Sequence, residues 1–171
     1  MLAASSTIKE VPQILFDSAS KKVLVKIGSE VQEFEMSEAD WGRGQLSAIL
    51  SQDKNTLVIN TKSVYKNNQF RSVDREIAVI DLKSKLQKKI QVLNTGEFLG
   101  WPERPSTNFL LHPKGSHLLF WSVDNGKIQV NLKDGSIKKV KSWAQYFDGQ
   151  GRLCGRASSR NEAEIPRLFR R

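Results

Sequence analysis

The sequence predicts an all-β chain made of short antiparallel strands. Short runs of branched apolar residues are separated by Gly, Asn and Asp at roughly ten-residue intervals. No stretch keeps apolar residues at helical spacing for about three turns. A seven-residue turn also recurs along the chain, and each copy follows an apolar strand and leads into another. These observations together predict antiparallel short-strand repeats.

The first strands are expected at residues 12–16, 23–27 and 31–36. A turn of small polar residues, DSASKK, joins the first two, because Asp and Ser side chains can bond their own backbone. Gly28-Ser29 turns the chain into the third strand. We expect these three strands to form a meander.

The central strands are expected at residues 46–50, 56–61, 77–82 and 88–93. The bridge 62–76, KSVYKNNQFRSVDRE, is long and polar. Loops of such length in compact domains are usually functional or disordered. The sequence therefore predicts a mobile loop at 62–76 with no role in the core.

Residues 94–107 contain two Pro and two Gly and are expected to be an irregular connection. A strand at 108–111 then leads through a tight Pro-Lys-Gly turn into a second apolar strand. Further strands at 127–132 and 136–140 are bounded by Asp-Asn-Gly and Lys-Asp-Gly turns.

Length and composition predict a flexible N-terminus (1–11), one β-repeat domain (12–156) and a basic C-terminal tail (157–171). The single cysteine, Cys154, excludes an internal disulfide framework. The sequence has no apolar run of about 18 residues, so it predicts no transmembrane helix. The net charge is +9, and residues 127–171 hold eleven Lys or Arg against four Asp or Glu. A basic segment of this kind attracts acidic proteins, nucleic acid or anionic lipid, or else serves as a solvated face that keeps the protein soluble.

Four turns align: DSASKKV (17–23), SQDKNTL (51–57), HPKGSHL (112–118) and FDGQGRL (147–153). The strand ends IAVIDLKS (77–84) and IQVNLKDG (128–135) also match, and each has an Asp or Asn that can satisfy turn N–H groups. These motifs resemble the blades of TolB-like and WD40-like β-propellers, which read Ser-Pro-Asp-Gly-x-x-Leu at the turn and Ile-x-Val-x-Asp-Leu in the third strand. The resemblance covers most of residues 12–153.

The resemblance implies about three and a half blades, whereas a closed propeller needs at least about four. The expected fold is therefore an open or partial propeller-like array. Three alternatives follow: the chain is a fragment of a larger propeller, it oligomerises, or its sheets pack as a β-sandwich.

Catalytic and metal-binding motifs are absent from the sequence. His112 and His117 flank one turn, and no Cys or carboxylate cluster lies close enough in sequence to complete a zinc site. No nucleophile elbow, P-loop, dinucleotide fingerprint or EF-hand loop occurs. The sequence therefore predicts no catalytic residue, metal or cofactor.

The preferred functional hypothesis is a non-catalytic module for protein–protein interaction. Aromatic residues beside arginines in irregular loops are typical of binding surfaces. The partner is expected to be another protein, and an acidic one would suit the excess of basic residues. The predicted contact residues are Trp41, Arg43, Tyr65, Phe70, Arg71, Trp101 and Arg104.

Two alternatives remain open from the sequence. The basic C-terminal third could bind nucleic acid or another anionic surface, although no exposed row of aromatics or nucleic-acid motif accompanies it. The chain could also be the propeller part of a larger enzyme, such as a serine peptidase. The basic patch of the first alternative consists of Lys138, Lys139, Lys141, Arg167, Arg170 and Arg171.

Overall fold

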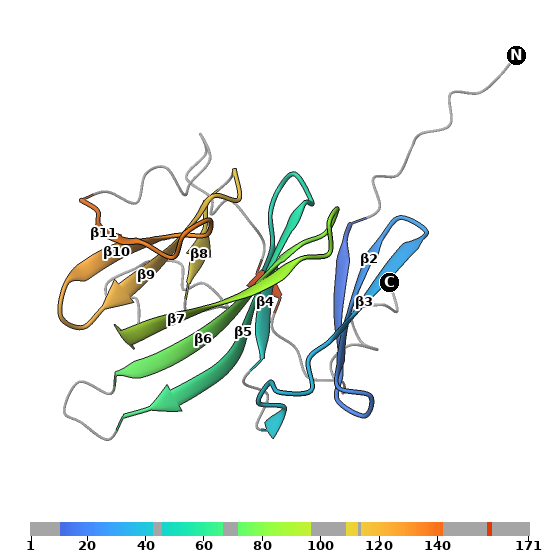
Figure 1. Cartoon of the computed structure of the whole chain (residues 1–171), viewed down its shortest axis with the longest axis horizontal. Coiled ribbons are helices and arrows are strands. Elements are labelled where there is room, and N and C mark those ends of the chain that lie inside the picture. The colour runs from blue at the N-terminus through green and yellow to red at the C-terminus, as the bar shows by residue number, and fades with distance from the viewer. Residues whose placement is uncertain are drawn as a thin grey trace, which may run out of the picture. The chain divides into compact units, whose positions relative to one another are not determined.

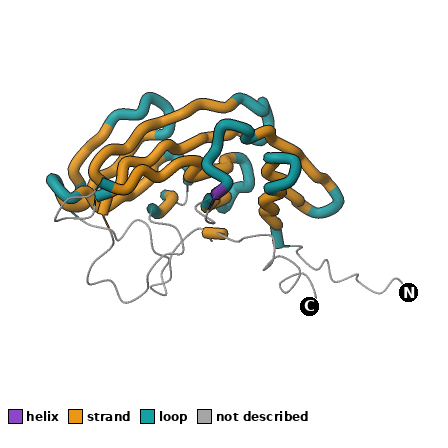
Figure 2. Tube along the Cα trace, turned by 90° about the horizontal axis from the view of Figure 1, so that it is seen from below, coloured by secondary structure: helices purple, strands orange, loops and turns teal. Residues whose placement is uncertain are grey.

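The computed structural model describes residues 11–42, 46–66, 72–96, 109–112 and 114–141, and the backbone of 157–158. Strands and loops make up this part of the chain, apart from one short 3-10 turn at Gly42 (Figure 2). All strand pairs are antiparallel. The prediction of an all-β, antiparallel fold is confirmed. The described chain divides into two compact units, one ending at Ser37 and one starting at Glu38.

The first unit is the predicted meander of β1 (Gln13–Asp17), β2 (Lys22–Ile27) and β3 (Glu30–Glu35). Its β1–β2 turn is held by Asp17, whose Oδ1 accepts bonds from the backbone N–H groups of Ala19 and Ser20. Hydrogen bonds from the Ser20 hydroxyl and N–H lower the pKa of Asp17. The local turn chemistry expected from DSASKK is therefore present.

The second unit is one open sheet with the order β11-β10-β9-β7-β6-β5-β4-β12, in which β8 also pairs with β9 (Figure 1). Two four-stranded meanders follow each other along the chain, and we call β4–β7 meander A and β8–β11 meander B. The strands are β4 (Ser47–Leu50), β5 (Thr56–Tyr65), β6 (Val73–Asp81), β7 (Gln87–Gly96), β8 (Leu110–Leu111), β9 (His117–Ser122), β10 (Gly126–Asn131), β11 (Ile137–Lys139) and β12 (Ala157–Ser158).

The first turns of the two meanders have the same geometry. In meander A the Lys54 N–H donates to the Ser51 carbonyl over 2.9 Å, and in meander B the Gly115 N–H donates to the His112 carbonyl over 2.7 Å. Lys54 and Gly115 both have a positive φ, of 62° and 71°. The turn SQDKNTL therefore matches HPKGSHL in backbone geometry as well as in sequence.

The third strands of the two meanders also end alike. The Asp81 Oδ1 accepts a bond from the Lys83 N–H over 2.9 Å, and the Asn131 Oδ1 accepts one from the Lys133 N–H over 2.7 Å. Backbone hydrogen bonds from Ser84 and Lys83 lower the pKa of Asp81. The predicted use of Asp and Asn to satisfy turn N–H groups is confirmed at both sites.

The main hydrophobic cluster lies in the second unit and draws on both meanders. Within this cluster the rings of Phe109 and Phe120 are in contact, with 5.6 Å between their centroids and a tilt of 33°. Burial of this apolar area is the chief source of stability for such a sheet. The cluster consists of Ile49, Val58, Ile77, Val79, Ile90, Val92, Phe109, Leu111, Leu118, Phe120, Ile128, Val130 and Leu132.

The prediction that residues 62–76 form a loop outside the core is wrong. β5 continues to Tyr65 and β6 begins at Val73, so most of this stretch is paired strand. Val73 is only 5% exposed. The alternation of buried and exposed residues along these strand ends is hard to recognise in the sequence. Ser63 and Arg75 occupy buried positions where an apolar residue is usual. β7 likewise extends to Gly96, into the predicted irregular connection.

Candidate functional site

Four strands of the second unit meet at one end of its sheet. Tyr65 at the end of β5 pairs with Val73 of β6, Val73 with Thr95 of β7, and Thr95 with Ser122 of β9. We call this row the Asn94 end, after the residue that organises it. The segments 67–71 and 97–108, which hold four predicted contact residues, are joined to the described chain here, at Lys66 and Gly96.

Asn94 forms a bulge in β7. The register against β6 shifts between Val73 and Arg75, and Asn94 has a φ of 53°. Asn tolerates this left-handed backbone better than most residues. The Asn94 N–H donates to the Asp74 Oδ1 over 2.9 Å, and its carbonyl accepts from the Val123 N–H over 2.9 Å. Beyond the bulge, Thr95 pairs with β6 on one side and with β9 on the other, so this part of β7 links the two meanders.

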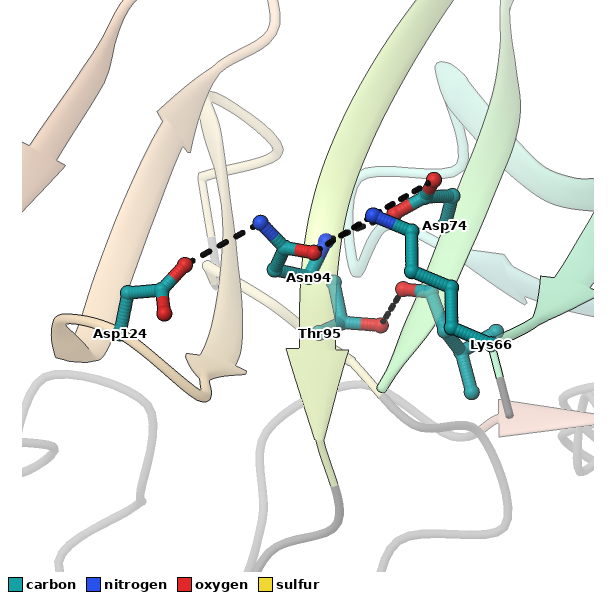
Figure 3. A network of polar contacts seen from close by, with 6 residues as sticks. Lys66, Asp74, Asn94, Thr95 and Asp124 are labelled. Carbon is teal, nitrogen blue, oxygen red and sulfur yellow. Dashed lines mark hydrogen bonds and ion pairs between the residues drawn. The ribbon is translucent and has the colours of Figure 1, made fainter. Parts of the chain in front are cut away.

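The Asn94 side chain joins charged residues from three strand ends (Figure 3). Its Oδ1 accepts a hydrogen bond from the Lys66 Nζ over 2.7 Å, and its Nδ2 donates to the Asp124 Oδ2 over 3.1 Å. The Lys66 Nζ also lies 3.2 Å from the Asp74 Oδ2. One amide therefore holds the end of β5, the start of β6 and the β9–β10 turn in fixed positions.

Replacing Asn94 is expected to destabilise the sheet in a graded way. Asn94→Gly keeps the positive φ but removes the side-chain bonds, which should cost about 1–2 kcal/mol. Asn94→Ala also places a Cβ in the left-handed region, which should add about 1 kcal/mol. Urea denaturation measures both free energies of unfolding. Equal stability of the Gly and Ala variants would show that the backbone at this position is not strained.

Arg75 is buried beside this network. Strand alternation places it on the same face of β6 as the core residues Ile77 and Val79, and it is only 6% exposed. Its Nε–H donates to the Thr95 Oγ1 over 3.0 Å, and its Nη1 donates to the Ser63 Oγ over 3.2 Å. We call Arg75, Ser63 and Thr95 the Arg75 cluster.

No carboxylate of the described residues forms an ion pair with Arg75. The neighbouring acids Asp74 and Glu76 alternate to the opposite face, where they pair with Lys66 and Lys89. Burial lowers the pKa of the Arg75 guanidinium, and the nearby Tyr65 phenol offsets part of this effect. An arginine nevertheless stays protonated in proteins. The cluster thus holds a buried positive charge solvated by hydroxyl groups.

The structure places two of the predicted contact residues along β5. Tyr65 lies at the Asn94 end and is 64% exposed. Trp41 follows Asp40, whose N–H donates to the carbonyl of Thr61 over 2.8 Å, at the bulge of β5. The other five, Arg43, Phe70, Arg71, Trp101 and Arg104, lie outside the described residues.

The basic patch is only partly described. Lys138 and Lys139 are exposed on β11, an edge strand of the sheet, and Lys141 follows them. None of these three lysines forms an ion pair with a described residue. Arg167, Arg170 and Arg171 lie outside the described residues.

Arg75, Asn94 and Trp121 belong to this site but are not predicted as site residues from the sequence. Trp121 is half-buried at the Asn94 end, and a Cβ on Gly96 would lie 3.1 Å from its Cδ1 atom, so a larger residue at position 96 would require the indole to shift slightly. Arg75 could have been found, because it continues the apolar alternation of Ile77 and Val79 toward Val73. Asn94 gave no signal, because an Asn-Thr-Gly sequence is typical of loops.

Comparison with known proteins provides no relative from which to transfer a function. No family model matches the sequence, and no curated protein shows significant similarity to it. Within the described ranges, no group of three or more His, Cys, Asp or Glu side chains could hold a metal ion. The same part of the chain has no helix long and apolar enough to cross a membrane.

Proposed function

We propose that this chain is a non-catalytic protein-binding module with β-propeller-like units, and that it contacts its partner at the Asn94 end of the sheet. One observation carries the proposal. This end combines an exposed tyrosine, a half-buried tryptophan, a buried arginine and the attachment points of both segments that hold most of the predicted contact residues.

The matched geometry of the two meanders supports the propeller-like part of the proposal. Each has four antiparallel strands, and their first turns and third-strand ends share the same hydrogen bonds. The pairing of β7 with β9 joins the meanders through two residue pairs, Thr95–Ser122 and Gly96–Trp121. Each meander is thus close to a separate four-stranded unit, as the blades of a propeller are.

The chemistry of the Asn94 end suits a protein surface as its ligand. Tyr, Trp and Arg are the side chains that most often dominate binding energy at protein interfaces. The network around Asn94 fixes Lys66, Asp74 and Asp124 before any partner binds. Such preorganisation reduces the entropic cost of association.

Site-specific photo-crosslinking tests this location. With a benzoylphenylalanine in place of Tyr65, the chain is expected to form a covalent adduct with its partner in native extract, identified by mass spectrometry. The matched control carries the same group in place of Leu86, which is 73% exposed in the β6–β7 turn at the opposite end of β6. Adducts from position 86 but not from position 65 would contradict the proposal.

The lysines of the edge strand β11, Lys138 and Lys139, which we call the basic edge, favour a second candidate function. This function is binding to nucleic acid or another anionic surface. Lys138 and Lys139 project from an exposed edge strand without ion pairs to described residues. The Lys127 Nζ donates to the Lys141 carbonyl over 3.3 Å, so this lysine also lies beside the edge. Lysines such as Lys138 and Lys139, which form no ion pair with a described residue, attract polyanions.

A further inference from the structure

Arg75 has more hydrogen-bond donors than its described surroundings can satisfy. A guanidinium has five N–H donors. One goes to Thr95 and one to Ser63, and the Nη2 atom makes no hydrogen bond to a described residue. Ser63 already accepts bonds from both Arg75 and the Asn60 Nδ2, so its own hydroxyl proton remains to be donated. The Arg75 guanidinium therefore keeps donors that no described residue accepts.

The surplus favours an anion of low charge. A buried charge without a counter-ion is costly, and a carboxylate can accept two parallel bonds from one guanidinium. Lys66 and Arg75 together balance Asp74 and Asp124, so this end of the sheet is neutral as a whole, although Arg75 itself forms no ion pair with a described residue. A nucleic-acid backbone with its many phosphates gains little at such a neutral end, whereas a single carboxylate can pair directly with the Arg75 guanidinium.

Resting on the proposed function, we propose that Arg75 binds the carboxylate of an Asp or Glu side chain that the partner protein inserts at the Asn94 end. The guanidinium presents its remaining N–H groups to this carboxylate, and the Ser63 hydroxyl donates a further bond. Thr95 positions the guanidinium through its bond to Nε, because its own hydroxyl is committed to the Val73 carbonyl at 2.7 Å.

The partner is not needed to test this site. The probe is N-acetyl-glutamate methylamide, which carries one side-chain carboxylate, and the matched control is the neutral glutamine compound. The readout is the Nε–H resonance of Arg75 in the ¹⁵N-labelled full chain, assigned by its absence in Arg75→Met. If Arg75→Met does not fold, Arg75→Lys supplies the same assignment.

The glutamate compound is expected to shift the Arg75 resonance saturably in the millimolar range, and the glutamine compound is expected to leave it in place. Ser63→Ala should weaken the binding about fivefold, as the loss of one hydrogen bond does. Lys138→Ala combined with Lys139→Ala should leave it unchanged. Removing the uncompensated charge in Arg75→Met should keep or raise the thermal unfolding midpoint.

Three results would overturn the carboxylate site. The glutamine compound could shift Arg75 equally, inorganic phosphate could bind it more tightly than the glutamate compound, or the resonance could fail to move. None of these results bears on the crosslinking from position 65, so failure of the carboxylate site and failure of the proposed function remain distinguishable. Crosslinking without a carboxylate effect would keep the interface and reject its proposed chemistry.

Discussion

Removal of residues 62–76, with β5 and β6 rejoined by a two-residue turn, is expected to abolish cooperative folding of the second unit. The deletion removes the paired row from Ser63–Arg75 to Tyr65–Val73 and the buried side chain of Val73. It also removes Lys66 and Asp74, which fix the Asn94 bulge. The end of β7 would lose its pairing with β6 and keep only the two pairs with β9. The summed loss should reach about 5 kcal/mol, comparable to the total stability of many domains.

The control variant replaces residues 67–71 with a two-residue Asn-Gly turn. Its anchors remain, because the Lys66 N–H donates to the Ser72 carbonyl over 2.9 Å. Closure entropy changes slowly with loop length, so this change should cost less than about 1 kcal/mol. Urea denaturation followed by tryptophan fluorescence compares the two. If the long deletion kept a cooperative transition within about 1 kcal/mol of the parent, the extended strands would contribute nothing.

Local hydrogen bonding explains which parts of the fold could be predicted. Short motifs predict the turns at Ser51 and His112 and the strand ends at Asp81 and Asn131. The hydrogen bonds at these places join residues only a few positions apart in the sequence. The extension of β5 and β6 could not be read this way. Its register depends on partners across the sheet, and its buried positions hold polar residues.

The candidate site was only partly predictable for the same reason. The sequence predicts Tyr65 as a contact residue because aromatics in polar segments often bind partners, and this side chain is exposed at the Asn94 end. Arg75 was overlooked because arginine is rarely fully buried. The link between β7 and β9 depends on one residue in a left-handed conformation, and this joins parts of the chain that are far apart in sequence.

The dependence of binding on salt should separate the two candidate functions most widely. The first candidate is a partner protein identified by crosslinking at position 65. Its affinity is expected to fall less than about tenfold between about 0.05 M and 0.5 M salt, because the proposed ion pair with Arg75 is buried and therefore weakly screened. Trp101→Ala and Arg75→Met should each weaken this binding by about 2 kcal/mol, as anchor residues do. Lys138→Ala with Lys139→Ala should have little effect.

A nucleic-acid binder would behave in the opposite way. Affinity for a short DNA duplex should then fall by about three orders of magnitude or more as salt rises. Binding releases counterions from the DNA phosphates, and a high salt concentration makes this release less favourable. Neutralising Arg167, Arg170 and Arg171 should flatten that slope, and Trp101→Ala should leave it unchanged. Fluorescence anisotropy of the labelled duplex measures both quantities. Tight duplex binding with a steep slope that Trp101→Ala does not alter would reject the protein-binding proposal in favour of the basic edge.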